Sequence, residues 1–256
     1  MRGTLRYLVT AVATLGLFGA SCGSDGSGSS ATGAVTVFAA ASLTGAYTKI
    51  GDAFMAANPD AMVTFNFAAS SDLVTQINEG APADVYASAD QANMKKLTDA
   101  AGNAGEPQVF ATNALQIIVE NGNPKAITGV ADLAQPGLIY VTCSPEVPIG
   151  KYAAQALATA GVTVTPASLE PNVKGIVTKV TAGEADAGIV YKTDVLAAGD
   201  QATGVDIPTD INVVATYPVV VTKGAPNPEG AQAFVDFVLS QQGQTILASF
   251  GFAQKD

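Results

Sequence analysis

The chain lacks histidine and tryptophan altogether, and charged residues make up only 13% of its 256 positions. Histidine is the commonest general base and the commonest protein ligand of transition metals. Its absence excludes a Ser-His-Asp triad and a Cys-His pair. Acid–base catalysis would have to rest on carboxylates, lysines or tyrosines, and the sequence gathers none of these into a recognisable cluster. We therefore expect neither an enzyme nor a site where side chains ligate a metal cation directly.

Positive charge and cysteine are also scarce. The 12 lysines and arginines are outnumbered by 22 acidic residues, which gives a net charge of −10 and no basic stripe. A nucleic-acid partner is therefore not expected. Of the two cysteines, Cys22 ends an N-terminal apolar run and Cys143 lies in the apolar segment "LIYVTC". A disulfide between them is not expected, and Cys143 is interpreted as a buried free thiol.

The N-terminus carries the features of an export signal. Arg2 and Arg6 precede an apolar stretch at 7–20, which is too short to span a bilayer comfortably. The following "FGASCG" resembles a bacterial lipoprotein cleavage site, although Gly19 stands where leucine is usual. We predict a signal peptide at 1–21, lipidation of Cys22 at the outer face of the cell membrane, and a flexible Gly/Ser tether at 22–33. Ordinary secretion with cleavage elsewhere is the alternative.

From residue 34 onward, short apolar runs alternate with segments of helical periodicity. Leu43, Tyr47, Ile50 and Phe54 show the helical spacing most clearly. The segments expected to form strands are 34–40, 62–70, 83–89, 114–120, 138–143, 187–191 and 217–224. Helices are expected to follow most of them, and two more are expected at 228–243 and 244–251. This alternation indicates an α/β fold, in one large or two small domains.

Four loops bring a small or apolar residue to the start of an expected helix. They are Ala41-Ser42, Ala69-Ser70, Pro148-Ile149-Gly150 and Asn172-Val173. The first amides of a helix have no partner within it and carry partial positive charge, so several helix starts can bind an anion without arginine or lysine. Taken singly, each serine is better explained as a helix N-cap than as a ligand contact, and Tyr191 as a core or rim tyrosine.

Taken together, these segments resemble the molybdate-binding proteins of ABC importers. The resemblance is carried by "VFAAASLTGAY", "FAASSDLVTQINEGAPADVYASAD", "PEVPIGKYAAQAL" and "NVKGIVTKVTAGEADAGIVY", and it extends from about Ala34 to Phe252. It implies the type II periplasmic binding protein fold, with two lobes that are each a mixed sheet flanked by helices. Lobe I would comprise 34–112 and 217–256, and lobe II 113–216. Two chain crossings, near Thr112-Asn113 and Thr216-Tyr217, would form the hinge.

The resemblance also implies a binding site made only of neutral donors. The ligand would be held by the hydroxyls of Ser42, Ser70 and Tyr191 and by the backbone amides of Ile149 and Val173. It implies a monomeric receptor without a cofactor, which delivers molybdate, and tungstate as well, to an ABC permease. Three alternatives stay open: a receptor for sulfate or another tetrahedral oxyanion, an enzyme on the same scaffold, and a sensor or interaction module.

The sequence departs from the family pattern in two places. Ile149 stands where alanine is usual, which keeps the backbone donor but enlarges the side chain. Asp72 stands where threonine is common, and a carboxylate aimed at a dianion would be strongly repelled. We therefore expect Asp72 to turn back and cap its own helix, or to be protonated when ligand is bound. Lys151, two residues beyond Ile149, is expected to be a solvated surface residue.

Overall fold

The computed structural model describes residues 31–254, so the predicted signal peptide and Cys22 lie outside the described residues. The strands are β1 (Gly33–Ala40), β2 (Ala61–Ala68), β3 (Val85–Ala87), β4 (Gln108–Glu120), β5 (Tyr140–Cys143), β6 (Ser168–Glu170), β7 (Ala187–Tyr191), β8 (Ala202–Asp206) and β9 (Val214–Val221). The helices are α1 (Thr44–Ala57), α2 (Ser70–Asn78), α3 (Gln91–Asp99), α4 (Pro148–Thr159), α5 (Val173–Thr181), α6 (Lys192–Ala198), α7 (Pro228–Leu239) and α8 (Gln241–Ser249). Three short 3-10 helices complete the set: η1 (Ala41–Leu43), η2 (Val130–Ala134) and η3 (Gly199–Gln201).

The strands pair in the order β2-β1-β3-β9-β4-β7-β5-β6, with β8 also paired to β4. β1 is parallel to β2 and β3, and β5 is parallel to β6 and β7, whereas the pairs that involve β4 and β9 are antiparallel. Residues 108–114 of β4 pair with β9, and residues 115–120 pair with β7 and β8. The long strand β4 therefore belongs to both ends of the sheet.

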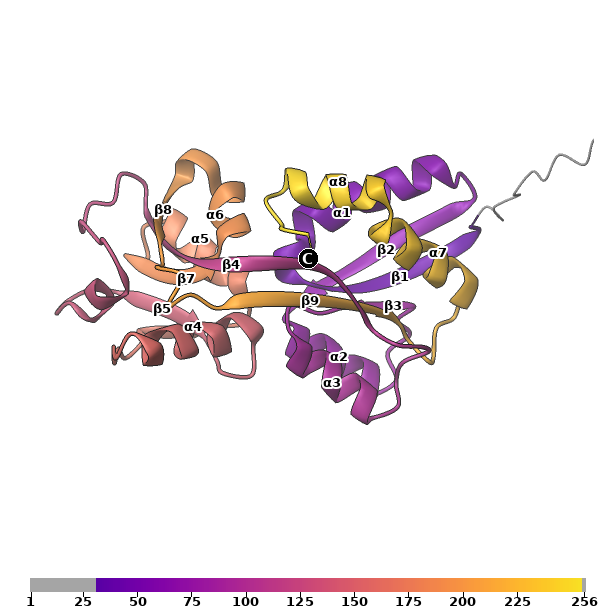
Figure 1. Cartoon of the computed structure of the whole chain (residues 1–256), viewed down its shortest axis with the longest axis horizontal. Helices are drawn as coiled ribbons and strands as arrows, with labels where there is room; N and C mark the ends of the chain where they lie inside the picture. Colours follow the sequence, from indigo (N-terminus) through magenta and orange to yellow (C-terminus); the bar gives the residue numbers. More distant parts are fainter. Residues whose placement is uncertain (1–30, 255–256) are drawn as a thin grey trace, which may run out of the picture.

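Two groups of elements lie at opposite ends of the strands β4 and β9 (Figure 1). The first half of the molecule contains β1–β3 with α1–α3, α7 and α8, and the second half contains β5–β8 with α4–α6. β4 and β9 run from one half to the other. The predicted α/β class is confirmed, because helices cover a mixed sheet in both halves.

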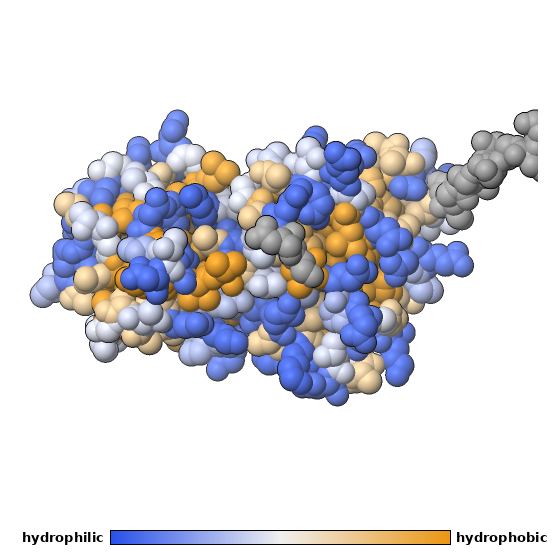
Figure 2. All heavy atoms as spheres, in the orientation of Figure 1, coloured by the Kyte–Doolittle hydropathy of each residue, from blue (hydrophilic) through white to orange (hydrophobic). Residues whose placement is uncertain are grey.

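Apolar side chains from the strands and the covering helices form the core. In the first half, Tyr47 and Phe54 of α1 pack edge-on against Phe234 of α7, with ring centroids 6.1 and 5.4 Å apart. Such aromatic pairs add to the free energy of burying their large apolar surfaces. Hydrophilic side chains cover much of the face seen in Figure 2, over both halves. No helix within residues 31–254 is long and apolar enough to cross a membrane.

A buried aspartate fixes the strand ends in each half. Asp84 lies just before β3, and its two carboxylate oxygens accept hydrogen bonds from the amides of Thr36 at 2.7 Å and Asn227 at 2.6 Å. Asp186 lies just before β7 and accepts from the amide of Ile139 at 2.7 Å. Charge-assisted hydrogen bonds from backbone amides offset the free-energy cost of burying a carboxylate. The same arrangement therefore ties neighbouring chain segments together in both halves.

Several elements were not expected from the sequence. β4 begins at Gln108, six positions before the apolar run that predicted it. The short strands β6 and β8 and the helix α6 were also missed. The segment between β4 and β5 forms a short 3-10 helix, η2. Most of these elements are short or partly exposed, so their sequences lack a strong hydrophobic period.

Cys143 offers a direct check of the predicted packing. It is buried at the end of β5, and burial, aided by the charges of Glu170 and Asp194, raises the pKa of its thiol to about 12. Because only the thiolate is reactive, a chain that begins at residue 23 should not be alkylated by iodoacetamide at pH 8 while folded. Alkylation should become rapid in guanidinium chloride. Equal rates in the two conditions, followed by mass spectrometry, would show that this packing is wrong.

Candidate functional site

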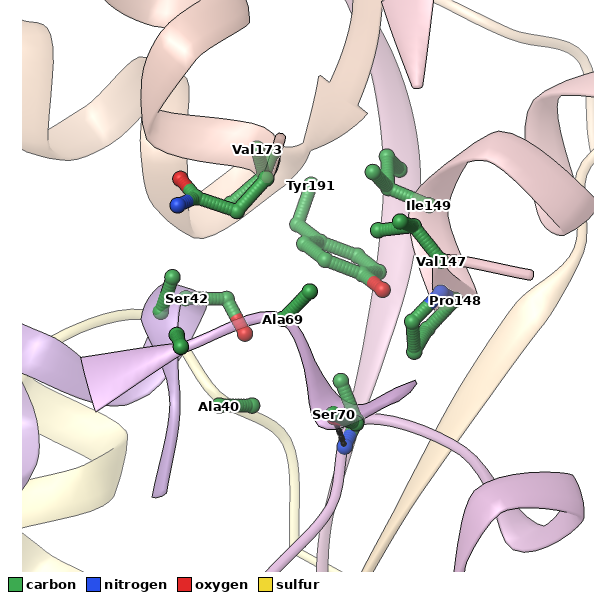
Figure 3. Close-up of a pocket in the computed structure, with 13 residues that line it drawn as sticks. Ala40, Ser42, Ala69, Ser70, Val147, Pro148, Ile149, Val173 and Tyr191 are labelled. Carbon is green, nitrogen blue, oxygen red and sulfur yellow. Dashed lines mark hydrogen bonds between the residues drawn. The ribbon is translucent and has the colours of Figure 1, made fainter. Parts of the chain in front are cut away.

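A small pocket lies where the two halves meet (Figure 3). It is lined by Ala40, Ala41, Ser42, Ala68, Ala69, Ser70, Ala89, Val147, Pro148, Ile149, Asn172, Val173 and Tyr191. The five residues predicted from the sequence as ligand contacts are all among them. Within residues 31–254, no charged side chain contributes to this lining.

The sheet positions the pocket at the carboxyl ends of its parallel strands. β1 ends at Ala40, β2 at Ala68 and β7 at Tyr191, and each of these three residues lines the pocket. Helices begin directly after these strands or after the neighbouring β5. This edge of an α/β sheet is where ligands usually bind. The abrupt turn from β1 into η1 at Ala41 therefore brings Ser42 into the pocket wall.

The start of α4 brings its first amides close to the end of β5. Pro148 has no amide proton, and the amide of Lys151 donates to the carbonyl of Val147 at 3.0 Å. The amides of Ile149 and Gly150 are then those that the helix itself cannot pair. A Cβ at Gly150 would lie 2.2 Å from the Ser144 carbonyl oxygen, so only glycine allows this backbone approach.

The start of α5 leaves one amide free in a similar way. The side chain of Asn172 caps the helix by accepting from the amide of Lys174 at 3.0 Å. The carbonyl of Asn172 accepts from the amide of Gly175 at 3.0 Å. Within this first turn, the amide of Val173 is left without an intrahelical partner. The structure thus places a backbone donor at each of the two apolar residues that the sequence had singled out.

The two serines do not cap their helices, so the capping interpretation is wrong. Ser42 is the second residue of η1, whose N-cap is Ala40, and Ser70 is the first residue of α2, whose N-cap is Ala69. Neither N-cap residue makes a side-chain capping bond. Both serines are buried in the pocket wall. Their hydroxyls are therefore committed to partners other than the helix ends.

The actual partners of the serine oxygens come from distant parts of the chain. Ser70 Oγ accepts a hydrogen bond from the amide of Ala89 at 3.0 Å. Ser42 Oγ lies 3.2 Å from the hydroxyl oxygen of Tyr217. Sequence reasoning missed both Ala89 and Tyr217. No local pattern marks them, because they are 19 and 175 positions away from the serines that they contact.

Tyr191 carries a buried hydroxyl that has no hydrogen-bond partner within residues 31–254. Burial, the largest cause, raises the pKa of this phenol well above its ordinary value. The hydroxyl therefore keeps its proton and can donate. Buried polar atoms without a partner are rare and call for an explanation. Since Tyr191 lines the pocket, a ligand oxygen in the pocket would provide the missing acceptor (Figure 3).

The backbone at Tyr191 is held by an ion pair between the buried Asp194 and the partly exposed Lys174. The amide of Tyr191 donates to a carboxylate oxygen of Asp194 at 3.3 Å, and the other oxygen lies 2.8 Å from Lys174 Nζ. Burial raises the pKa of the Asp194 carboxyl, and the lysine opposes that shift. The charges of this pair are thus directed at each other and at the backbone, and neither side chain lines the pocket.

Asp72 and Lys151 both lie outside the pocket lining and are exposed. Asp72 accepts a hydrogen bond from the Ser71 hydroxyl at 3.4 Å. It does not cap α2, whose N-cap Ala69 makes no side-chain capping bond, so the expectation that Asp72 would cap its own helix is wrong. Lys151 is a surface residue, as predicted. Within residues 31–254, no three His, Cys, Asp or Glu side chains are grouped to hold a metal cation.

Comparison with known proteins assigns the chain to a family. Residues 35–253 match the sequence profile of the bacterial extracellular solute-binding proteins. The chain belongs to this family. The prediction of a binding protein, as opposed to an enzyme, is thereby confirmed. The predicted resemblance to molybdate-binding proteins is confirmed as well, by the relatives described next.

The relatives of this solute-binding protein are consistent with one another. Molybdate-binding protein ModA of Mycobacterium tuberculosis is 42% identical over 253 residues, which cover 96% of each chain. The Escherichia coli protein of the same name is 34% identical, over 87% of this chain and 90% of its own. Both lengths match closely, so the similarity covers the whole binding domain.

Solved structures place the fold among periplasmic binding proteins. The Azotobacter vinelandii periplasmic molybdate-binding protein aligns with a TM-score of 0.76 at 19% identity, over 87% of this chain and 100% of its own. The sulfate-binding protein SubI of Mycobacterium tuberculosis aligns with a TM-score of 0.78 at 21% identity, over 87% of both chains. At such identities the likeness shows the fold alone.

The unpartnered hydroxyl leads to a prediction about stability. Tyr191→Phe removes a buried polar group that lacks a partner while it keeps the ring. We expect the free energy of unfolding of the ligand-free protein to stay the same or to rise, by up to about 1–3 kcal/mol. Urea unfolding in oxyanion-free buffer measures this. A clear loss of stability would mean that the hydroxyl has a partner within the protein.

The serines should differ from each other in the same experiment. Ser70→Ala leaves the buried amide of Ala89 without its acceptor, so we expect a loss of about 1–3 kcal/mol. Ser42→Ala breaks the longer contact with the Tyr217 hydroxyl, at 3.2 Å, so its effect should be smaller. Equal losses in the two variants would contradict the assigned hydrogen bonds.

Proposed function

We propose that this protein captures molybdate, and tungstate as well, outside the cytoplasm and delivers it to an ABC permease. The relatives that are 42% and 34% identical over most of their length carry the name of molybdate-binding proteins. The observation that carries the proposal is the buried, unpartnered hydroxyl of Tyr191 in a pocket without charged lining side chains. The ligand contacts are Ser42, Ser70, Ile149, Val173 and Tyr191.

Neutral donors suit an oxyanion that carries no proton. Every group assigned to the ligand is a hydroxyl or an amide N–H, and a fully deprotonated tetrahedral dianion presents only acceptors. A protonated anion such as hydrogen phosphate would direct its own O–H at one of these donors. Such a mismatch weakens binding by about 1–3 kcal/mol. The pocket therefore favours molybdate over phosphate because its groups all donate hydrogen bonds. This preference does not depend on the net charge of the protein.

Size must distinguish molybdate from sulfate, which also presents only acceptors. Molybdate and tungstate are larger than sulfate and nearly equal to each other. The distances between donors on the two halves of the molecule set the size that fits. Ile149 contributes a buried apolar side chain to this wall. We therefore expect molybdate and tungstate to bind alike, and sulfate to bind more weakly because it cannot reach all donors at once.

The two halves of the sheet act in this proposal as lobes that close on the ligand. Lobe I comprises 34–112 and 217–256, and lobe II comprises 113–216. The proposed hinge crossings lie side by side, since Thr112 pairs with Thr216 in the β4–β9 ladder. Ser42 and Ser70 belong to lobe I, whereas Ile149, Val173 and Tyr191 belong to lobe II. Closure about the hinge brings both sets of donors to one anion.

The N-terminal segment anchors the receptor in the same proposal. Lipid on Cys22, after removal of residues 1–21, would hold the chain at the outer face of the cell membrane. The end of the predicted Gly/Ser tether at 22–33 overlaps the folded domain, because β1 begins at Gly33 and the amide of Ala31 donates to Asn58 Oδ1 at 3.0 Å. The binding domain would work as a monomer close to its permease. This placement keeps the captured anion near the transporter that takes it up.

Calorimetry with four oxyanions tests the proposal. Molybdate and tungstate should bind with micromolar or tighter dissociation constants, sulfate more weakly and phosphate least. Ser42→Ala and Ser70→Ala should each weaken molybdate binding about 10-fold or more, which corresponds to the loss of one buried hydrogen bond to a charged group. Lys151→Ala is the matched control. It should leave the affinity within about twofold, because the exposed lysine lies outside the pocket lining.

Two outcomes would contradict the proposal. Tighter binding of sulfate than of molybdate would assign the pocket to the smaller anion. A large loss of affinity in Lys151→Ala would show that a cation, in addition to neutral donors, holds the ligand.

A further inference from the structure

Each serine hydroxyl of the pocket also makes a hydrogen bond to a distant part of the protein. Ser70 Oγ accepts from the amide of Ala89, and Ser42 Oγ is paired with the hydroxyl of Tyr217. A serine hydroxyl carries one proton and two lone pairs. When the oxygen already accepts a hydrogen bond from behind, its single proton is left to donate in another direction. For a ligand that presents only acceptors, this is the useful orientation.

The two partners differ in what they can do. An amide N–H only donates, so Ala89 fixes the orientation of Ser70. A tyrosine hydroxyl can donate or accept, so the orientation of Ser42 depends on what else contacts Tyr217. Within residues 31–254, Ser42 Oγ is the hydrogen-bond partner of the Tyr217 hydroxyl, at 3.2 Å, whereas Asn113 Nδ2 donates to Thr193 Oγ1 at 2.9 Å. When the single proton of Ser42 goes to a bound anion, the buried Tyr217 hydroxyl still has a proton to donate, and Ser42 Oγ is the acceptor within reach.

We infer that Tyr217 is a positioning residue for oxyanion selection: it donates to Ser42 Oγ and thereby commits the Ser42 proton to the bound anion. The inference rests on the proposed function. Tyr217 lies on β9 and is buried, but it is not among the residues that line the pocket. It therefore acts through Ser42 and does not touch the ligand.

The surroundings of Tyr217 keep its hydroxyl in the required state. Burial raises the pKa of this phenol well above its ordinary value, so the proton is retained. The ring packs edge-on against Phe252 and Phe110, with centroid distances of 5.4 and 6.2 Å. These contacts fix the position of the ring independently of the hydroxyl. The hydroxyl can therefore be removed by Tyr217→Phe with little change in packing.

The orientation at Ser42 has a consequence for selectivity. While Tyr217 donates to it, Ser42 has one proton to give and offers little to a ligand that brings a proton of its own. Without Tyr217, the Ser42 oxygen is free to accept as well as to donate. A protonated anion such as hydrogen phosphate would then meet a suitable acceptor. Tyr217 thus disfavours protonated anions without contacting them.

A double-mutant cycle of Tyr217→Phe and Ser42→Ala tests this inference. Tyr217→Phe should weaken molybdate binding about 5- to 30-fold, the range expected when one hydrogen bond is no longer oriented. In the Ser42→Ala background the same change should weaken it less than about twofold, because the hydroxyl that Tyr217 orients is gone. Tyr47→Phe is the matched control. It removes another buried tyrosine hydroxyl, which does not line the pocket, and should leave the affinity unchanged.

Selectivity gives a second readout that altered packing alone would not move. The ratio of the dissociation constants for phosphate and molybdate at pH 7, measured by competition, should fall in Tyr217→Phe. The ratio for sulfate and molybdate should stay the same, because both anions carry only acceptors. Unchanged molybdate affinity in Tyr217→Phe, an equal loss with and without the Ser42 hydroxyl, or an unchanged phosphate ratio would overturn the inference.

The wild-type measurement separates this inference from the proposed function. If the wild-type protein binds another oxyanion more tightly than molybdate, the proposed ligand is wrong, and the same cycle is run with that anion. If the wild type binds molybdate but the cycle shows no coupling, the proposed function stands and only the role of Tyr217 is rejected.

Discussion

The binding site depends on helix starts whose first amides have no partner within their own helices. The starts of α2, α4 and α5 all reach one pocket at the carboxyl edge of the sheet. At α4 the approach is so close that a Cβ at Gly150 would collide with the backbone at Ser144. The sheet, the buried aspartates at its strand ends and this glycine all serve to hold these amides in place. An anion that fills the pocket satisfies them together.

Neutral donors explain how an acidic chain can bind an anion. The net charge of −10 is spread over the whole chain, whereas the pocket presents only partial positive charges at short range. The ion pair of Lys174 and Asp194 holds the backbone of Tyr191, and neither side chain lines the pocket. A hydroxyl or an amide has a fixed direction, so this kind of site distinguishes ligands by where their protons are. A lysine in the same place would attract any anion and distinguish less.

The sequence predicted the α/β class, and the five ligand contacts that it predicted all lie in the pocket lining, but for reasons of unequal strength. Periodicity and turn residues indicated the strands and helices, because β1, α1 and α4 bury strong apolar faces. Ser42 and Ser70 looked like helix caps, since serine favours that position. The structure shows that the caps are Ala40 and Ala69. Only the resemblance to a family gave the serines another role.

What the sequence could not reveal is which distant residues support the site. Tyr217 begins an apolar run and looks like an ordinary strand residue, and the 175 positions between it and Ser42 hide their contact. Ala89 carries no side-chain signal at all, because its contribution is a backbone amide. The short elements β6, β8 and α6 were missed since they bury little. Such pairings follow from topology, which local patterns do not specify.

The most direct test of the account is a crystal structure of the protein with molybdate bound. The anion's oxygens should lie within about 2.7–3.2 Å of the hydroxyls of Ser42, Ser70 and Tyr191 and of the amides of Ile149 and Val173. No charged side chain should touch the anion. A ligand oxygen bound by Lys151 or Lys174, or an anion that leaves the Tyr191 hydroxyl without a partner, would contradict the account.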